Sequence, residues 1–283
     1  MKRRGFLKTS LALTAALAAP ALGQSLVLRF GLTPVFLSND LALVNSLEEY
    51  FGRVTGARVQ LVQKRTYQEI TALLVAGRLD AAWICGYPFI RFKDDLQLLS
   101  VPLWRGRPLY QAYLIAAAGR NAASIDDLRG DLHCFSDPDS NSGYLVTSAL
   151  LVDRQMHPDE YFSKTFFAYG HRNVVRAVAA KLAQSGSVDG YVWEVLSQIE
   201  PELTQNTSVI TKSDWLGFPP IAAPKASIGT PEYDIIKTAV LNMHKDAQGQ
   251  QILGMLKLDS FGPPEGSDFK KIAAFMQKVQ DFG

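Results

Sequence analysis

Short polar side chains gather in one stretch of the sequence, FSDPDSNSGYL (135–145), directly ahead of an apolar segment. Ser140, Asn141 and Ser142 offer hydroxyl and amide donors, and Gly143 adds no side-chain bulk. The first backbone N–H groups of a helix lack partners within the helix, and its dipole places about half a positive charge there. We therefore expect this loop to bind a tetrahedral oxyanion at a helix N-terminus.

The same residue types are also typical of an ordinary helix N-cap, which needs one oxygen-bearing side chain. Here four of them follow one another, from Asp139 to Ser142, and this excess favours a ligand site. The loop follows the predicted strand 132–135, and the strands of an α/β sheet point their carboxyl ends at the ligand crevice.

Helical and strand patterns alternate along the chain, which is typical of an α/β protein with a mostly parallel sheet. Apolar residues recur at helical spacing in 40–56 and 66–77, and strand patterns occupy 57–63 and 80–88. A further helix is expected in 173–186. Its inward face would carry Val174, Val175, Val178 and Leu182.

Two strand-like segments, 108–119 and 218–226, are expected to pair as connectors between two lobes. The predicted first lobe comprises 24–113 and 221–283, and the predicted second lobe comprises 114–220. Two lobes joined by two strands form a hinge, which closes around a ligand held in the cleft between them.

The N-terminus predicts export. Arg3 and Arg4 precede a short apolar run, 11–22, and a small-residue cleavage site follows it. We interpret residues 1–23 as a twin-arginine signal peptide. The run is shorter than the roughly 20 apolar residues that span a membrane. The mature protein is therefore expected in the periplasm.

The charge of the chain depends on that segment. The full sequence has 29 Lys+Arg and 27 Asp+Glu. Removing Lys2, Arg3, Arg4 and Lys8 leaves 25 basic and 27 acidic residues, a net charge of −2. No basic run remains after the signal peptide, so we expect no nucleic-acid partner.

Motifs of catalytic and metal sites are absent from the sequence. There is no G-x-S-x-G elbow, H-E-x-x-H motif or Walker A loop, so we expect neither an enzyme nor a cofactor. The four histidines are scattered and no C-x-x-C motif occurs, so we expect no metal site. Whether Cys85 pairs with Cys134 is left open.

The stretch DPDSNSGYL resembles the D-P-x-S-T-S-G-Y pattern of the phosphate/phosphonate/phosphite substrate-binding proteins of ABC transporters, with Asn141 in the threonine place. These are type II periplasmic binding proteins. The resemblance covers nearly all of the mature chain. Its supporting segments are TYQEITALLVAGRLDAAWICGYP, GHRNVVRAVAAKLAQSGSVDGYVWEVL, FPPIAAPKA and ILGMLKLDSFGP.

The resemblance implies two α/β lobes with a small oxyanion between them and an ABC permease of the inner membrane as partner. The protein is expected to act as a monomer. Ser140, Asn141 and Ser142 would hold the anion. Further ligand contacts are implied for Tyr67, Gly86, Tyr87 and His171.

From the residues alone, these further positions have plainer interpretations. Tyr67 at a helix start could simply pack, and His171 could satisfy backbone groups. A protonated His171 would attract an oxyanion, since histidine titrates near neutral pH. Glu194 follows a predicted strand end, where a carboxylate would suit a ligand that also carries a cationic amine or a proton.

Cys85 points to an alternative function. A lone buried cysteine is usually a small apolar residue, but its thiol could also bind a soft ligand such as arsenite. One branch of the same family resembles that description and consists of periplasmic sensors that signal to a membrane histidine kinase. Transport of a phosphonate, phosphate or phosphite is the main hypothesis, and sensing is the alternative.

Overall fold

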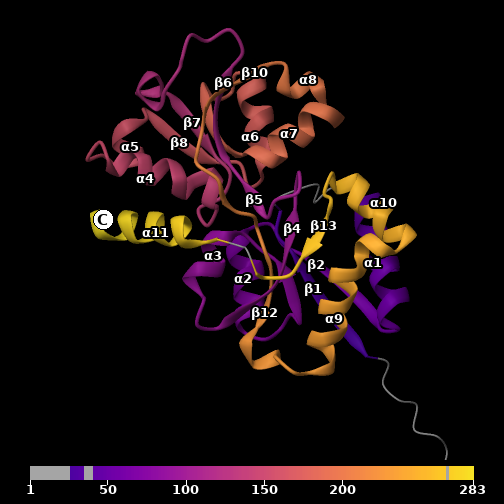
Figure 1. Ribbon diagram of the computed structural model, residues 1–283. Helices are drawn as coiled ribbons and strands as arrows, with labels where there is room; N and C mark the ends of the chain where they lie inside the picture. Colours follow the sequence, from indigo (N-terminus) through magenta and orange to yellow (C-terminus); the bar gives the residue numbers. More distant parts are fainter. Residues whose placement is uncertain (1–25, 35–40, 266–267) are drawn as a thin grey trace, which may run out of the picture.

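The computed structural model describes residues 26–34, 41–265 and 268–283, which form two α/β lobes (Figure 1). The first lobe contains a six-stranded sheet in the order β13-β4-β12-β3-β1-β2. Its strands are β1 (Val27–Leu32), β2 (Arg58–Gln63), β3 (Ala81–Trp83), β4 (Leu96–Leu103), β12 (Ile221–Pro224) and β13 (Ser260–Gly262). The proposed signal peptide, 1–23, lies outside the described residues.

The second lobe contains a five-stranded sheet in the order β10-β6-β9-β7-β8. Its strands are β6 (Ala112–Ala117), β7 (Leu132–Phe135), β8 (Lys164–Phe167), β9 (Ser185–Asp189) and β10 (Thr207–Lys212). Both sheets are mixed, so the expectation of mostly parallel sheets is wrong. Parallel pairing holds for β1 with β2 and β3 and for β7 with β8 and β9. The other strands pair antiparallel: β12 with β3 and β4, β13 with β4, and β6 with β9 and β10.

Helices cover both sheets. Those of the first lobe are α1 (Leu41–Thr55), α2 (Tyr67–Val75), α3 (Gly86–Arg91), α9 (Pro231–Asn242) and α10 (Ala247–Leu256). Those of the second lobe are α4 (Val146–Val152), α5 (Pro158–Tyr161), α6 (His171–Ala179), α7 (Gly190–Ile199) and α8 (Pro201–Thr204), with a π-helical turn, η2 (Asn141–Leu145), leading into α4. In these described elements, no helix is both long and apolar enough to cross a bilayer.

Apolar faces of these helices form the core as the helical spacing predicts. The inward residues of α1 are Leu43, Leu47, Tyr50 and Phe51. The prediction for α6 is wrong at one position. Leu182 is 67% exposed, since α6 ends at Ala179 and Lys181 turns the chain with a left-handed φ of 58°.

Two short strands, β5 (Leu109–Tyr110) and β11 (Leu216–Gly217), pair antiparallel between the lobes. They occupy part of the expected connectors, whose remaining residues enter β6 and β12. The C-terminal helix α11 (Lys270–Phe282) packs against α4 of the second lobe (Figure 1). Lys278 of this helix pairs with Asp153. The lobe limits expected from sequence stay a prediction.

Candidate functional site

Five helical segments begin next to one another where the lobes meet. The first residues of α2, α3, η2, α6 and α7 are Tyr67, Gly86, Asn141, His171 and Gly190. Contacts between the lobes link these ends directly, and each end contributes the positive end of a helix dipole. Such a cluster is suited to hold an anion without a cationic side chain.

Asn141 connects the two lobes through its backbone and its side chain. Its backbone N–H donates to the sulfur of Cys85 at 3.2 Å, and the N–H of Tyr87 also hydrogen-bonds this sulfur. Its Nδ2 donates to the Tyr110 hydroxyl at 2.7 Å. Ser142 hydrogen-bonds the same hydroxyl. Burial raises the pKa of the Cys85 thiol to about 12, so the thiol is protonated at neutral pH.

A second chain of hydrogen bonds runs through His171. Its Nδ1 accepts the backbone N–H of Asp189 at 3.1 Å, so the ring proton lies on Nε2. That atom is 3.3 Å from the Tyr67 hydroxyl, which therefore accepts and keeps its own hydrogen for another partner. Burial lowers the pKa of His171 to about 3, so the imidazole is neutral at neutral pH, and its contact with a ligand stays a prediction.

The loop that carries the serines is shaped by Gly143. Ser140 is the N-cap of η2 and accepts the Gly143 N–H at 3.0 Å, which is the ordinary capping role. A Cβ at Gly143 would lie 1.8 Å from Ser136 Oγ, so only glycine fits there. Ser140 thus caps the helix, whereas Asn141 and Ser142 hydrogen-bond the Tyr110 hydroxyl.

Two buried carboxyl groups border the cluster. Asp137 accepts the backbone N–H of Tyr67 at 3.2 Å and that of Asp139 at 2.8 Å, and thereby docks the serine loop on α2. Asp189 caps α7 by accepting the Val192 N–H at 3.2 Å. Burial raises the pKa of both carboxyls, that of Asp189 to about 7.

An opening of about 220 Å³ adjoins Asp137 at the boundary of the lobes. Arg91 of α3 pairs across this boundary with Asp139 at 2.7 Å and stacks over the Tyr87 ring at 5.2 Å. Tyr87 is half-buried and contacts Arg91, which lines this opening.

The structure places Glu194 in a separate ionic cluster. Its carboxylate accepts the Tyr113 hydroxyl at 2.9 Å and pairs with Arg105 at 3.2 Å and Lys212 at 3.7 Å. Gly86 is needed for close packing, since a Cβ there would lie 2.7 Å from Ile272 of α11. Ligand contacts by Glu194 and Gly86 stay predictions.

Sequence reasoning missed three residues of this cluster. Tyr110 lies in the hinge strand, Asp137 opens the serine loop, and Asp189 ends β9. Only Asp137 carried a sequence signal, as the first residue of the DPDSNSGY pattern. No group of His, Cys, Asp and Glu side chains in the described parts of the chain is arranged to hold a metal ion. Cys85 and Cys134 are free and buried.

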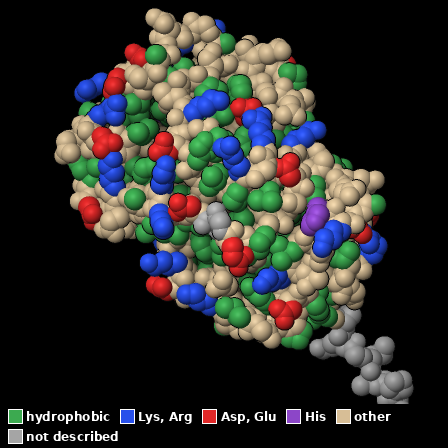
Figure 2. Space-filling view, viewed as in Figure 1, with side chains coloured by type: hydrophobic (Ala, Val, Ile, Leu, Met, Phe, Trp, Pro, Cys, Tyr) green, Lys and Arg blue, Asp and Glu red, His purple; other side chains and the backbone are tan. Residues whose placement is uncertain are grey.

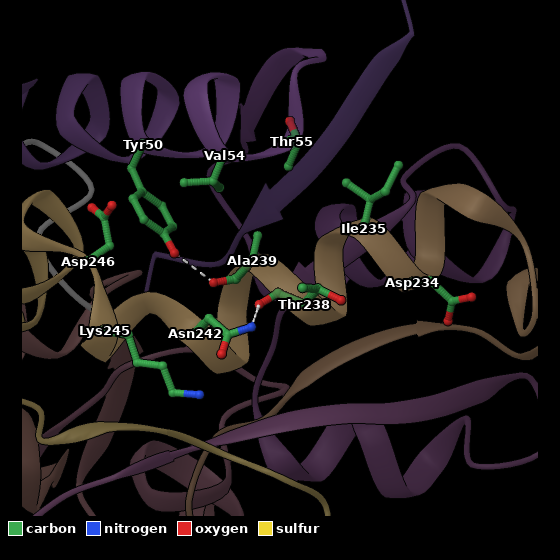
Figure 3. A pocket seen from close by; sticks show the side chains of 10 residues that line it. All are labelled: Tyr50, Val54, Thr55, Asp234, Ile235, Thr238, Ala239, Asn242, Lys245 and Asp246. Atoms are coloured by element: carbon green, nitrogen blue, oxygen red, sulfur yellow. Dashed lines mark hydrogen bonds between the residues drawn. The ribbon is translucent and has the colours of Figure 1, made fainter.

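A hollow of about 450 Å³ lies away from this cluster, between α1 and α9, where the Tyr50 hydroxyl donates to Ala239 O at 2.7 Å (Figure 3). None of its lining residues belongs to the helix ends described above. On the face shown in Figure 2, acidic and basic side chains intermingle, as the near-neutral composition predicts.

Residues 30–269 match the family of periplasmic substrate-binding proteins of phosphonate ABC transporters. The chain belongs to this family. It is 30% identical over 128 residues to the phosphate-import protein PhnD of Mycolicibacterium smegmatis, and the match covers 42% of this chain and 40% of that protein. The chain thus matches less than half the length of this curated relative.

Solved structures share the fold. A binding protein component of an ABC phosphonate transporter from Pseudomonas aeruginosa superposes with a TM-score of 0.81 at 20% identity, covering 92% of this chain and 88% of that one. PhnD1 from Prochlorococcus marinus, in complex with methylphosphonate, gives a TM-score of 0.79 at 18% identity, covering 90% and 98%. At these identities the likeness supports the two-lobe fold of type II periplasmic binding proteins.

Proposed function

We propose that this protein captures a small phosphorus oxyanion between its lobes and delivers it to an ABC permease of the inner membrane. The observation that carries the proposal is the convergence of helix N-termini from both lobes on Asn141, Tyr67 and His171. A lobe-to-lobe site formed by backbone N–H groups and hydroxyls fits a tetrahedral anion. The names of the relatives point to phosphonate and phosphate as the ligand class.

The remaining parts of the proposal follow the family. Residues 1–23 would direct export through the twin-arginine route and be removed. The mature protein would act as a monomer in the periplasm and release its ligand chemically unchanged. It would need neither a metal nor a cofactor.

Thermal shift assays with phosphate, phosphite, methylphosphonate and 2-aminoethylphosphonate test the ligand class. At least one should raise the Tm of the wild type by several degrees, because binding to the native state alone stabilises it. Ser142→Asp should abolish the shift, since it adds a like charge beside the anion. Ser163→Asp, on an exposed serine of the second lobe, is the control and should keep the shift. An unmoved Tm with all four anions, together with a shift from another solute class, contradicts the proposal.

A second candidate is a sensory binding protein for a soft ligand. The observation in its favour is that the Cys85 sulfur lies inside the cluster, 3.2 Å from the Asn141 nitrogen. The raised pKa of this thiol favours the first candidate, since a thiolate is the form that binds soft ligands. An arsenite-induced shift that Cys85→Ser removes would support sensing.

A further inference from the structure

The side chain of Asn141 is held at one end only. Its Nδ2 donates to the Tyr110 hydroxyl at 2.7 Å, and the residue is 0% exposed. Its Oδ1 is buried and has no hydrogen-bond partner among the described residues. A buried polar atom without a hydrogen-bond partner destabilises the fold relative to a satisfied one, because it has lost its hydrogen bonds to water. It therefore calls for an explanation.

An amide oxygen can only accept a hydrogen bond. A fully deprotonated oxyanion also only accepts, so it would repel this oxygen instead of satisfying it. A ligand with a hydroxyl group would supply the missing donor. The other unpartnered oxygen of this loop, Ser136 Oγ, belongs to a hydroxyl that can donate or accept and so does not discriminate.

The charges around Asn141 agree with this requirement. Asp137 and Asp189 are the buried acids of the cluster, and burial raises the pKa of each. His171 is neutral, and the remaining titratable groups facing the cluster are the Cys85 thiol and the hydroxyls of Tyr67 and Tyr110. No Lys or Arg is among the buried polar residues of the described ranges. A second negative charge on the ligand would thus meet carboxyl groups and no buried cation.

We propose that Asn141 makes this site select the hydroxyl-bearing monoanion of its ligand, with Oδ1 accepting the hydrogen bond of that hydroxyl. The ligand class is a phosphonate or phosphite, whose monoanion carries one P–OH group and whose dianion carries none. The inference rests on the proposed function, because it names the protonation state of the same ligand. A threonine hydroxyl, which the family pattern has at this position, can donate and would not impose the requirement.

The selection has a measurable pH dependence. Above the second pKa of the ligand, the fraction of monoanion falls about tenfold per pH unit, and the apparent affinity falls with it. The pH at which affinity begins to fall must then follow the ligand. If a protein group such as Asp189 governed binding, the affinity would begin to fall at one pH for every ligand.

Calorimetric titrations of methylphosphonate and phosphite, from about pH 5.5 to 9, test the proposal. For the wild type, the fall in affinity should begin at a higher pH for whichever ligand has the higher second pKa. Dimethylphosphinate, a monoanion without a hydroxyl, should bind at least about tenfold more weakly than methylphosphonate, which corresponds to one missing hydrogen bond to a buried acceptor. Asn141→Thr should weaken the pH dependence of the affinity for methylphosphonate and phosphite. It should also reduce the difference in affinity between methylphosphonate and dimethylphosphinate.

Tyr110→Phe is an independent variant, since it releases the Nδ2 anchor and lets the amide turn its donor to the ligand. It should also reduce the preference for hydroxyl-bearing anions. A fall at the same pH for both ligands, or an unchanged preference in Asn141→Thr and Tyr110→Phe, overturns the role of Asn141. Absence of binding by every anion at every pH would overturn the proposed function, and the inference with it.

Discussion

The backbone N–H of Asn141 donates to the sulfur of Cys85 at 3.2 Å, and this contact joins the first turn of η2 to the N-cap of α3. The two residues belong to different lobes. The sulfur thus occupies a position where the N-terminal ends of two helices face each other. The neutral thiol sulfur accepts hydrogen bonds from backbone N–H groups at helix N-termini, which could equally bind an anion.

Replacing Cys85 tests this contact. Cys85→Ala removes the acceptor and should lower the free energy of unfolding by about 1–3 kcal/mol, because the Asn141 N–H is left buried without a partner. Cys85→Ser keeps a hydrogen-bond acceptor at this position, so its free energy of unfolding should fall by less. Urea denaturation of the three proteins measures the difference. Equal stability of the alanine and serine variants would show that the N–H finds another partner.

Gly143 should be irreplaceable in the serine loop. A Cβ there would lie 1.8 Å from Ser136 Oγ and 2.9 Å from Ser140 Oγ, so Gly143→Ala must displace both hydroxyls. Oxyanion affinity should fall by more than about tenfold, and overpacking should cost about 1–3 kcal/mol of stability. Gly254→Ala, in an open position of α10, is the matched control. It should leave affinity unchanged and raise stability by up to about 1 kcal/mol.

The ion pair between Arg91 and Asp139 should favour the closed state. It spans the lobes at 2.7 Å, with 41% of the arginine side chain exposed, so its contribution is about 0.2–1 kcal/mol. Arg91→Ala should raise the ligand dissociation rate by about two- to fivefold in stopped-flow measurements, and high salt should reduce the difference. Arg154→Ala breaks a pair with Asp126 inside the second lobe and should not change that rate.

Asp189 should make stability depend on pH in a defined direction. Burial raises the pKa of Asp189 in the folded state from its ordinary value of 3.8 to about 7, so folding favours the protonated acid. Its stabilising contribution is present below about pH 3.8 and is lost as pH rises through about 7. The asparagine of Asp189→Asn cannot ionise, and its side-chain oxygen can still accept the hydrogen bond of the Val192 N–H. It should be more stable than the wild type at about pH 8, on the order of 2–4 kcal/mol. This advantage should shrink on acidification, and a constant difference at all pH values would contradict the raised pKa.

His133 and His171 should have the opposite dependence. Burial lowers both pKa values to about 3, so the stability from their neutral forms is present above pH 6.5 and is lost as pH falls towards 3. Ser185 and Ser187 bind the two ring nitrogens of His133, each at 2.8 Å. The NMR shifts of both imidazoles should stay at neutral values between about pH 5 and 8. A midpoint near 6.5 for either ring would show that it is accessible to protons in the fold.

Local patterns were sufficient to predict α1, α2 and most of α6, the serine loop and its position after a strand. The strand expected over 80–88 is shorter, since β3 ends at Trp83 and α3 begins at Gly86. The α1 core residues follow from helical spacing, and the glycine at position 143 from the need for a bare first turn. Leu182 shows the limit of periodicity. It continues the apolar stripe of α6, but the chain turns at Lys181, whose φ is left-handed. Lysine has no preference for this conformation, so the sequence does not predict the turn.

Contacts between distant residues could not be predicted in the same way. Tyr110 reaches Asn141 only because β5 and β11 pair at the hinge, and Asp189 reaches His171 only because α6 packs against β9. The neutrality of His171 follows from burial between the lobes. Burial depends on how the lobes meet and on no single segment of sequence.

The central claim is that a phosphorus oxyanion sits against Asn141 and Ser142 between the lobes. The most direct measurement is a ³¹P NMR titration of methylphosphonate, or of whichever phosphorus anion raises the Tm, with the wild type and Ser142→Asp. We predict a separate, shifted resonance for the anion bound to the wild type and only the free resonance with the variant. An identical bound resonance with both proteins would place the anion elsewhere and contradict the account.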